Sequence, residues 1–407
     1  MKLRRFVHAA TAGVLALAAT AVAPAGPALA AYADPLTALD ASRYGLVWHP
    51  TPSAAISALD AALPNVGVAT ILGDANHTMK TCDATENAAL PIAPAATTKL
   101  CWDDSDTAVA SWNPQGITSS GDADDDGAWG ANQLLISGWQ YTVDDGRHND
   151  ARIAFIDYNN PSAARYRWAY LVAPNSTGST FSAAKAHLGG MIWYGDKLLV
   201  TAVGNTSTAI RVFSMSHILE TTDNAATIGR TSKGWAAYGY QYVLPQIGYY
   251  SYAAGTCSMA TNTGTPCFSS ISLDRSTSPD SLVASEYFAD GQGSRLFRYP
   301  FAADYLPATA ANEAYASGVA NAQGVLSYNG RWYVAHSSAS YPGQLWRLTP
   351  GAAGVSATCT NPGTSPNMCW ALHPEALTYW YSTGLVWSQT EWPNQRTIFA
   401  LPLSTLP

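Results

Sequence analysis

A pattern of short strands recurs along this 407-residue chain and constrains its fold more than any other feature. Each copy has a polar residue followed by Gly or Ala, an apolar strand, a turn, a second apolar strand, a loop and a third strand. The copy that begins at Gln323-Gly324 has the clearest boundaries, because its turn is Asn329-Gly330, a dipeptide that favours a tight hairpin. The other copies begin near Gln115, Gly189, Gln246 and Glu375.

Repeated meanders of this kind cannot bury both of their faces alone, so they predict sheets stacked radially. We therefore expect an all-β fold, a five-bladed β-propeller that forms a single domain over residues 34–407. No room for a fourth strand remains after the last copy, so an N-terminal strand near 45–48 or 66–72 should complete that blade and remove its open edge. Six blades, or a β-sandwich or jelly roll, are the alternatives.

The first thirty residues have the pattern of an export signal. Lys2, Arg4 and Arg5 precede an apolar stretch that runs to Val22, and small residues follow at 28–30. We interpret residues 1–30 as a signal peptide rather than as a membrane anchor. No second apolar stretch is long enough to span a bilayer. The sequence thus predicts a secreted, extracellular protein without membrane insertion.

Six cysteines fall into three pairs that are local in sequence, and export makes disulfides the default state of such pairs. Zinc binding is a poorer interpretation, since no C-x-x-C spacing occurs. The bridges expected are Cys82–Cys101, Cys257–Cys267 and Cys359–Cys369.

Composition excludes several functional classes. Only 12% of the residues are charged, and 21 Lys and Arg stand against 28 Asp and Glu, so no broad cationic face is available for nucleic acid. No G-x-S-x-G motif or Gly-rich phosphate loop occurs, so we expect neither a serine triad nor a nucleotide or organic cofactor. The 14 Trp and 22 Tyr are typical of sheet cores, interfaces and sugar-binding clefts.

Polar residues open the copies of the pattern, and in a propeller these positions converge at one mouth of the central channel. They are Asn113, Gln115, His187, Gln246, Asn321, Gln323, His373 and Glu375. Such a set can serve as the floor of a ligand site, with His187, His373 and Glu375 as its titratable members. Alternatively, it is a structural ring in which amides satisfy backbone groups.

A second candidate set follows the second strands of the copies. Glu286, His336 and Glu391 lie there, and Trp139 has the matching place in the first copy. Cleavage of a glycosidic bond needs two carboxyl groups, for which Glu286, Glu375 and Glu391 are the candidates. If the reaction is β-elimination, His187 or His336 would be the base. Sugar rings would contact Gln115, Trp139, Gln246, Tyr287, Gln323 and Trp392. Alternatively, the charged groups form surface ion pairs.

One acidic motif resembles the first half of a calcium loop. Alternate carboxylates at Asp122, Asp124 and Asp126 precede Gly127, which permits a tight bend. The usual terminal Glu is missing, because the twelfth position is Gln133. Calcium is therefore the one cofactor considered, and a solvated acidic hairpin loop is the alternative.

The chain resembles a largely uncharacterised family of exported bacterial β-propeller proteins. The resemblance is carried by Gln-Gly-Ile at 115–117, by His-x-Gly-Gly-x-x-Trp-Tyr-Gly at 187–195, by Tyr-x-Leu-Pro-Gln at 242–246 and by His-Pro-Glu at 373–375. It covers most of the mature chain but implies no known chemistry. Five-bladed propellers as a class are similar to glycan hydrolases and lectins, an analogy at the level of the fold.

These observations lead to a functional hypothesis. We expect a secreted, monomeric carbohydrate-active enzyme, a glycoside hydrolase or polysaccharide lyase, that cleaves an extracellular polysaccharide or oligosaccharide at the channel mouth. The alternatives are a lectin-like glycan-binding propeller without catalysis and an interaction protein of the cell envelope.

Overall fold

The computed structural model describes residues 33–288, 292–360 and 365–407, which belong to one compact unit that runs to Pro407. The expected signal peptide lies outside the described residues. Within those three ranges, no helix is both long enough and apolar enough to cross a membrane.

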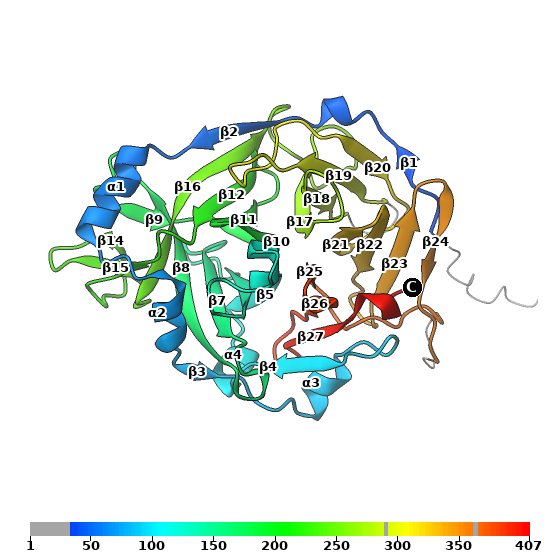
Figure 1. The fold of residues 1–407 in the computed structure, drawn as a ribbon, viewed down its shortest axis with the longest axis horizontal. Helices are drawn as coiled ribbons and strands as arrows, with labels where there is room; N and C mark the ends of the chain where they lie inside the picture. Colours follow the sequence, from blue (N-terminus) through cyan, green and yellow to red (C-terminus); the bar gives the residue numbers. More distant parts are fainter. Residues whose placement is uncertain (1–32, 289–291, 361–364) are drawn as a thin grey trace, which may run out of the picture. The chain divides into compact units, whose positions relative to one another are not determined.

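The chain is built mainly of antiparallel sheets, as expected for an all-β protein (Figure 1). The first meander contains β5 (Trp112–Ser119), β6 (Leu134–Tyr141), β7 (Ala151–Asp157) and β8 (Arg165–Pro174). The second contains β10 (Ala186–Tyr194), β11 (Lys197–Ala202), β12 (Thr208–Ser214) and β16 (Tyr242–Tyr252). The strands predicted for the first two copies therefore form, and Tyr194 and Lys197 flank the expected hairpin turn.

Two further meanders follow in chain order, and an N-terminal strand completes the last sheet. One contains β17 (Phe268–Asp274), β18 (Ser281–Glu286), β19 (Arg295–Pro300), β20 (Glu313–Ala316) and, on its edge, β1 (Thr37–Ala38). The next contains β21 (Ala322–Tyr328), β22 (Arg331–His336), β23 (Gln344–Thr349) and β24 (Ala352–Ser356). The last contains β25 (Thr378–Trp380), β26 (Leu385–Gln389), β27 (Thr397–Pro402) and β4 (Thr98–Cys101).

The remaining elements are short and lie outside these meanders. The strands are β2 (Leu46–Pro50), β3 (His77–Thr78), β9 (Phe181–Ala183), β13 (Leu219–Glu220), β14 (Ile228–Arg230) and β15 (Trp235–Ala237). The α-helices are α1 (Ser53–Ala62), α2 (Gly67–Gly73), α3 (Ala84–Ala88), α4 (Asp104–Ala108) and α5 (Ser120–Ala123).

The structure corrects the expected start of the third copy. Gln246 was predicted to open an inner strand, but it lies within β16, the outer strand of the second meander. At this residue β16 changes partner, because Pro245 pairs with Val172 of β8 and Gln246 pairs with Phe213 of β12. The true inner strand of the third meander is β17, which begins at Phe268 and has no Gln-Gly at its start.

The structure also corrects the strand that closes the last sheet. Residues 46–50 form β2, which pairs with β16, and residues 67–73 form the helix α2. The strand that pairs with β27 is β4, in which Cys101 lies opposite Thr397. Closure by N-terminal sequence is therefore confirmed, whereas both segments proposed for it were wrong.

The inner strands contact one another in a closed cycle. Strand β10 contacts both β5 and β17, and β17 contacts β21. Gly324 of β21 lies against the backbone of Glu375, and the next residue, Ala376, donates its N–H to the Gln115 carbonyl of β5 at 3.4 Å. Figure 1 shows these strands nearest to the common centre of the meanders. The described part of the chain thus has the radial arrangement of a β-propeller.

Glycines permit the close approach of neighbouring inner strands. A Cβ atom on Gly116 would lie 2.4 Å from the Leu188 carbonyl oxygen, and one on Gly190 would lie 1.9 Å from the Ile271 nitrogen. Contacts this short involve rigid backbone, which cannot move aside as a side chain can. The Gly that recurs in the sequence pattern is therefore required because backbone meets backbone around the centre.

Replacing Gly190 with Ala should destabilise the fold. Because the added methyl group meets the backbone nitrogen of Ile271, we expect the free energy of unfolding to fall by about 3 kcal/mol, the upper end of the usual cost of overpacking. Urea unfolding followed by tryptophan fluorescence measures this. Gly73→Ala is the matched control, since no atom lies within 4 Å of a Cβ built at Gly73. Equal stability of the two variants would contradict the account.

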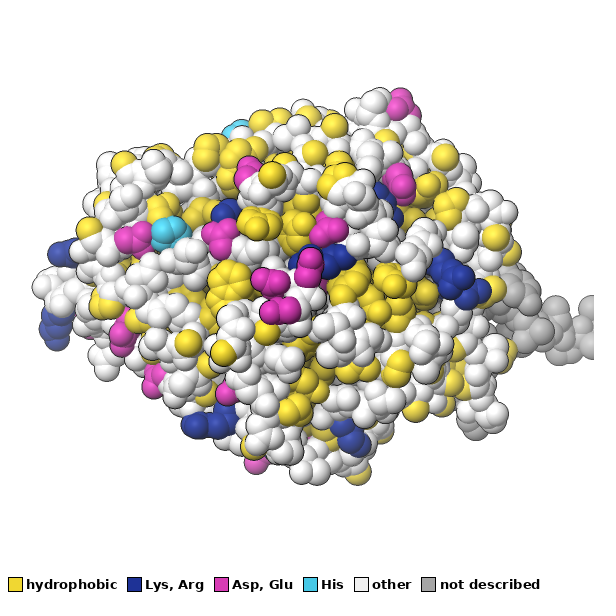
Figure 2. Space-filling view, in the orientation of Figure 1, with side chains coloured by type: hydrophobic (Ala, Val, Ile, Leu, Met, Phe, Trp, Pro, Cys, Tyr) yellow, Lys and Arg dark blue, Asp and Glu magenta, His cyan; other side chains and the backbone are white. Residues whose placement is uncertain are grey.

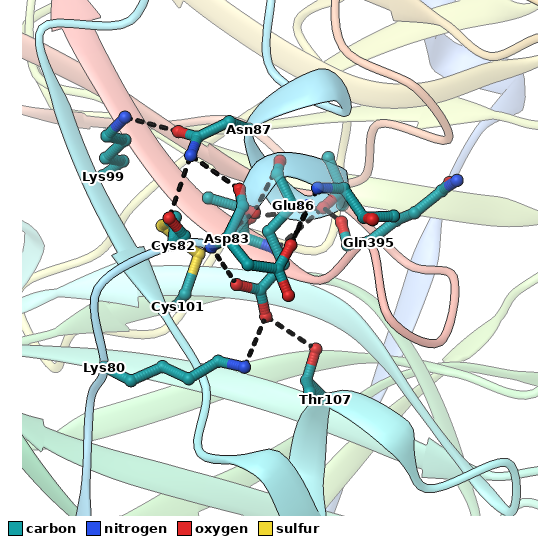
Figure 3. The surroundings of a disulfide bond; sticks show 12 residues. Lys80, Cys82, Asp83, Glu86, Asn87, Lys99, Cys101, Thr107 and Gln395 are labelled. Atoms are coloured by element: carbon teal, nitrogen blue, oxygen red, sulfur yellow. Dashed lines mark hydrogen bonds and ion pairs between the residues drawn. A yellow bond between two sulfur atoms is a disulfide. The ribbon is translucent and has the colours of Figure 1, made fainter.

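The expected disulfides all form: Cys82–Cys101, Cys257–Cys267 and Cys359–Cys369. The first attaches the segment before α3 to the closing strand β4. Figure 3 shows beside it the buried carboxylate of Glu86, which accepts from Thr107 Oγ1 at 3.0 Å and lies 3.3 Å from Lys80 Nζ. This disulfide therefore stabilises the position of the strand that closes the last sheet.

Removing this disulfide should loosen the closure. The bridge joins residues 19 positions apart, for which loop-closure entropy predicts a loss of about 3 kcal/mol. We expect the Cys82→Ser/Cys101→Ser variant to show faster amide hydrogen exchange in β4 and β27 than in β21 and β22. Uniform exchange throughout the chain, or no change at all, would show that the bridge does not hold the closing strand.

Candidate functional site

A pocket of about 340 Å³ lies at the starts of the inner strands. Three residues predicted from sequence line it: His187, Tyr287 and Gln323. They come from different sheets, because His187 belongs to β10, Tyr287 follows β18 and Gln323 belongs to β21. Two of the polar residues expected to converge at the strand starts, His187 and Gln323, thus line one pocket, together with Tyr287 from the end of a second strand.

Loops that the sequence analysis did not select complete the pocket. Asn149 precedes β7, Asn205 lies between β11 and β12, and Met259 lies in the segment before β17. The Cys257–Cys267 disulfide closes the segment that carries Met259, and Asn205 Oδ1 accepts the Met259 N–H at 2.9 Å. Phe268, at the start of β17, adds an aromatic ring. Their loop positions left no periodic signal by which sequence reasoning could have found them.

The imidazole of His187 is held in one orientation. Its Nδ1 lies 2.7 Å from Gln140 Oε1, an amide oxygen that can only accept, so Nδ1 carries the proton. Burial lowers the pKa of His187 from 6.5 to about 4, which keeps the ring neutral at physiological pH. A neutral ring with a protonated Nδ1 leaves Nε2 as a hydrogen-bond acceptor.

A cluster of amides and carboxylates adjoins the pocket through Gln323. Gln323 Nε2 donates to Glu375 Oε1 at 3.2 Å. Glu391 Oε1 accepts from Asn113 Nδ2 at 2.8 Å and from Gln115 Nε2 at 3.0 Å. Burial and the neighbouring charge of Glu391 raise the pKa of Glu375 well above its ordinary value, and burial also raises the pKa of Glu391. Sequence reasoning selected Gln115, Gln323, Glu375 and Glu391, and the structure brings them together.

His373 and Trp392 form a separate contact beside this cluster. Their rings stack with centroids 3.6 Å apart and planes 5° from parallel. The Glu391 N–H donates to the His373 carbonyl at 3.1 Å, which ties the two segments together. His373 is buried, whereas Trp392 is 46% exposed, and neither lines the pocket. The Trp392 ring that was expected to contact a sugar is thus covered on one face by His373.

The structure places Glu286 outside the cluster. Its carboxylate is fully buried and paired with Arg295, at 2.6 Å from Nε and 2.8 Å from Nη2. It also accepts the Cys267 N–H at 2.9 Å. A carboxylate held by both arms of a guanidinium and by a backbone donor is a structural ion pair rather than an acid or base that substrate can reach.

Two residues expected to contact sugar lie elsewhere. Trp139 is fully buried in the core, where its Nε1 donates to Ser137 Oγ at 3.1 Å and its ring packs edge-on against Trp102. Gln246 accepts from Arg211 Nη1 at 2.6 Å on the outer strand β16. Neither lines the pocket. Trp139 was misjudged because a buried ring and a cleft ring look alike in sequence.

His336 ends β22 and lies apart from the pocket lining. Its Nδ1 is 2.8 Å from the carbonyl oxygen of Ala320, which joins it to the loop before β21. The structure therefore gives His336 a role in holding this loop.

The three aspartates of the acidic motif point in different directions. Asp122 is buried and accepts from Thr118 Oγ1 at 2.6 Å and from Thr378 Oγ1 at 2.8 Å. Asp124 and Asp126 are exposed and accept backbone N–H groups within their own loop. Where the structure describes the chain, these aspartates do not appear among the groups of three or more ligands close enough to hold a metal ion.

The surface chemistry agrees with the low charge of the chain. Figure 2 shows one face, on which acidic and basic side chains gather near the middle and hydrophobic surface lies between them. At the far ends of the inner strands, Arg275 pairs with Asp125 and lies 3.3 Å from Asp280. Arg275 therefore lies between two carboxylates at this end of the strands.

The arrangement suits binding better than bond cleavage. None of Glu286, Glu375 and Glu391 lines the pocket, and the first two have fully buried side chains. Cleavage of a glycosidic bond needs two carboxyl groups on opposite sides of the substrate. The pocket instead presents a neutral imidazole, amides and apolar side chains.

The pKa of His187 leads to a pH-dependent stability. An unfolded chain takes up a proton at His187 near pH 6.5, whereas the folded chain does so near pH 4, so stability is lost as the pH falls through this window. Between pH 7 and pH 4.5, the free energy of unfolding should fall by about 2 kcal/mol less in His187→Gln than in the wild type. Identical slopes for the two proteins, measured by urea unfolding, would exclude the buried neutral state.

Comparison with known proteins assigns no family. No protein-family model and no curated protein matches the chain. Among solved structures, it is similar to a fungal lectin from Aleuria aurantia, which is described as a six-bladed β-propeller with a novel fucose recognition mode. The TM-score is 0.30 and the sequence identity is 10%, and the match covers 70% of this chain and 72% of the lectin chain. A mercury derivative of the fucose-specific lectin from Aleuria aurantia has a TM-score of 0.29 at 10% identity, over 73% and 81%. Similarity at this level carries no conclusion about a ligand.

Proposed function

We propose that this protein is an exported, lectin-like propeller that binds an oligosaccharide or polysaccharide in the pocket at the starts of its inner strands, without cleaving it. The observation that carries the proposal is the composition of that pocket, in which the polar side chains of His187 and Gln323 occur together with apolar groups such as Phe268 and Met259.

Sugar rings need such a mixture of groups. Their hydroxyls donate and accept hydrogen bonds, for which a neutral imidazole and planar amides are suited, and their C–H faces pack on aromatic rings. A pocket of about 340 Å³ lies at the small end of the range of ligand pockets. We therefore propose that it takes one terminal sugar unit rather than a long internal stretch of chain.

A non-catalytic role is favoured over the hydrolase or lyase reading. The buried pair Glu286–Arg295 supports the fold, and Glu375 reaches the pocket only through the amide of Gln323. His336, the other base considered for elimination, is bonded to a backbone carbonyl. Cleavage by these groups would require them to be reoriented. His187 does line the pocket, but its pKa, lowered to about 4, makes it a weak base for elimination at neutral pH.

Two further properties belong to the proposal. We infer five blades from the cycle of inner strands, in which the last sheet contacts the first, although the fungal lectin in the comparison is described as six-bladed. We infer export from the three disulfides, because such bonds persist in oxidising compartments.

A glycan array followed by calorimetric titration of its best ligand tests the proposal. We expect binding of at least one glycan and no release of reducing ends from it. His187→Ala and Tyr287→Ala should each weaken binding about tenfold or more, the effect of losing one good contact of about 1.4 kcal/mol. Trp392→Ala should leave affinity unchanged, because Trp392 lies outside the pocket.

Three results would contradict the proposal. The absence of any bound glycan in a broad array would remove the carbohydrate ligand. Loss of affinity in Trp392→Ala but not in His187→Ala would show that the glycan binds at the exposed ring of Trp392 and not in the pocket. If the wild-type protein releases reducing ends and Glu375→Gln does not, the protein is an enzyme and the binding proposal is wrong.

A further inference from the structure

Two buried oxygen atoms in the amide and carboxylate cluster have no hydrogen-bond partner among the protein atoms. They are Oε2 of Glu375, whose residue is 0% exposed, and Oε1 of Gln115, whose residue is 2% exposed. A buried polar atom without a partner costs about 1–3 kcal/mol, and a buried carboxylate costs more. Two such atoms on neighbouring residues therefore require a physical explanation.

The backbone brings these two residues together. Gln115 lies on β5, and its carbonyl accepts the N–H of Ala376, the residue next to Glu375. Gln115 Nε2 also donates to Glu391 Oε1 at 3.0 Å, and the charge of Glu391 acts on Glu375. The two carboxylates and the Gln115 amide thus form one cluster, located where β5 meets the last sheet.

The negative charge of this cluster is not compensated by an ion pair. Across the described ranges, no Lys, Arg or His forms a salt bridge with Glu375 or Glu391. The nearby Arg396 directs its donors to the carbonyls of Asp106, Val109, Trp112 and Glu391 and to Asn113 Oδ1. Burial raises the pKa of Glu391 and the charge of Arg396 acts on it in the opposite direction from this position, but none of these bonds goes to a carboxylate oxygen. Both carboxylates therefore keep oxygen atoms that a bound cation could contact.

We propose that Glu375, Glu391 and the amide oxygen of Gln115 form a binding site for a hard divalent cation of the calcium class. Calcium takes six to eight oxygen ligands from carboxylates, amides and water in flexible geometry. Gln323 and Asn113 now donate N–H groups to the carboxylates, and a rotation of either amide would present its oxygen without moving the backbone. Magnesium, which demands octahedral geometry at short distances, fits these long side chains less well.

This site is distinct from the acidic motif at residues 122–126 and does not depend on the proposed glycan binding. Its position does link the two, because Gln323 lines the pocket and contacts Glu375. The competing explanations for the two unpartnered oxygens are a proton, since a protonated Glu375 could donate to Gln115 Oε1, and an ordered water that donates to both. If a cation binds here, added calcium should be taken up and should raise Tm; if Glu375 is protonated or a water bridges the two oxygens instead, added calcium should do neither.

Calcium titration of protein freed of metal with EDTA and then desalted tests the proposal without any sugar. At pH 7, calorimetry should show one Ca²⁺ bound per chain, and saturating Ca²⁺ should raise Tm by at least about 3 °C. Mg²⁺ and Na⁺ at the same concentration should give smaller shifts. Glu375→Gln and Glu391→Gln should each weaken Ca²⁺ binding at least tenfold, whereas Asp124→Asn should bind Ca²⁺ as the wild type does.

Absence of Ca²⁺ uptake by the wild-type protein would overturn the proposal and leave protonation or an ordered water as the explanation. Uptake that is lost in Asp124→Asn but kept in Glu375→Gln would overturn it as well, because the acidic motif would then be the binding site. Circular dichroism confirms that each variant is folded. Because the wild-type titration needs no variant and no glycan, its outcome is separate from that of the glycan array.

Discussion

Close contact between the backbones of neighbouring inner strands is the constraint on which the rest of this structure depends. At Gly116, Gly190 and Gly324, a side chain of any size would meet the backbone of the next inner strand or segment. These glycines let the strands approach around a narrow centre. The approach fixes where each inner strand begins, and so it decides which side chains meet there. Packing at the centre and the location of the site therefore have one physical cause.

The close approach of the inner strands also determines the protonation and hydrogen bonding of the polar residues beside these glycines. His187 becomes a neutral acceptor because burial disfavours its charge and Gln140 orients its ring. Glu375 and Glu391 are held close together among amides, which is unfavourable for two free carboxylates and favourable for two carboxylates that share a cation or a proton. A pocket bordered by such groups offers donors and acceptors that suit the hydroxyls of the glycan we propose as its ligand. This supports a binding function in place of the enzyme first expected.

Much of the fold could be predicted from sequence, because its signals are local. The Asn329-Gly330 turn, the alternating strands and the cysteine spacing each depend on nearby residues. What failed depends on distant partners. Nothing near residues 98–101 shows that they pair with β27, and nothing near Gln246 shows that β16 changes from β8 to β12 there.

Glu286 was taken for a catalytic residue because its partner, Arg295, lies on the next strand and is not apparent from the sequence around Glu286. Trp139 was taken for a sugar-binding residue because sequence does not distinguish a core ring from a cleft ring. Asn149, Asn205 and Met259 were missed because loops carry no periodicity.

A crystal structure of the protein with its best oligosaccharide from the array tests the central claim most directly. The account predicts one sugar unit in the pocket, with a hydroxyl within hydrogen-bond distance of His187 Nε2 and a ring face against an apolar side chain such as Phe268. An intact glycosidic bond is expected after long incubation. A sugar seated on another face of the molecule, or a cleaved product beside Glu375 and Glu391, would contradict it.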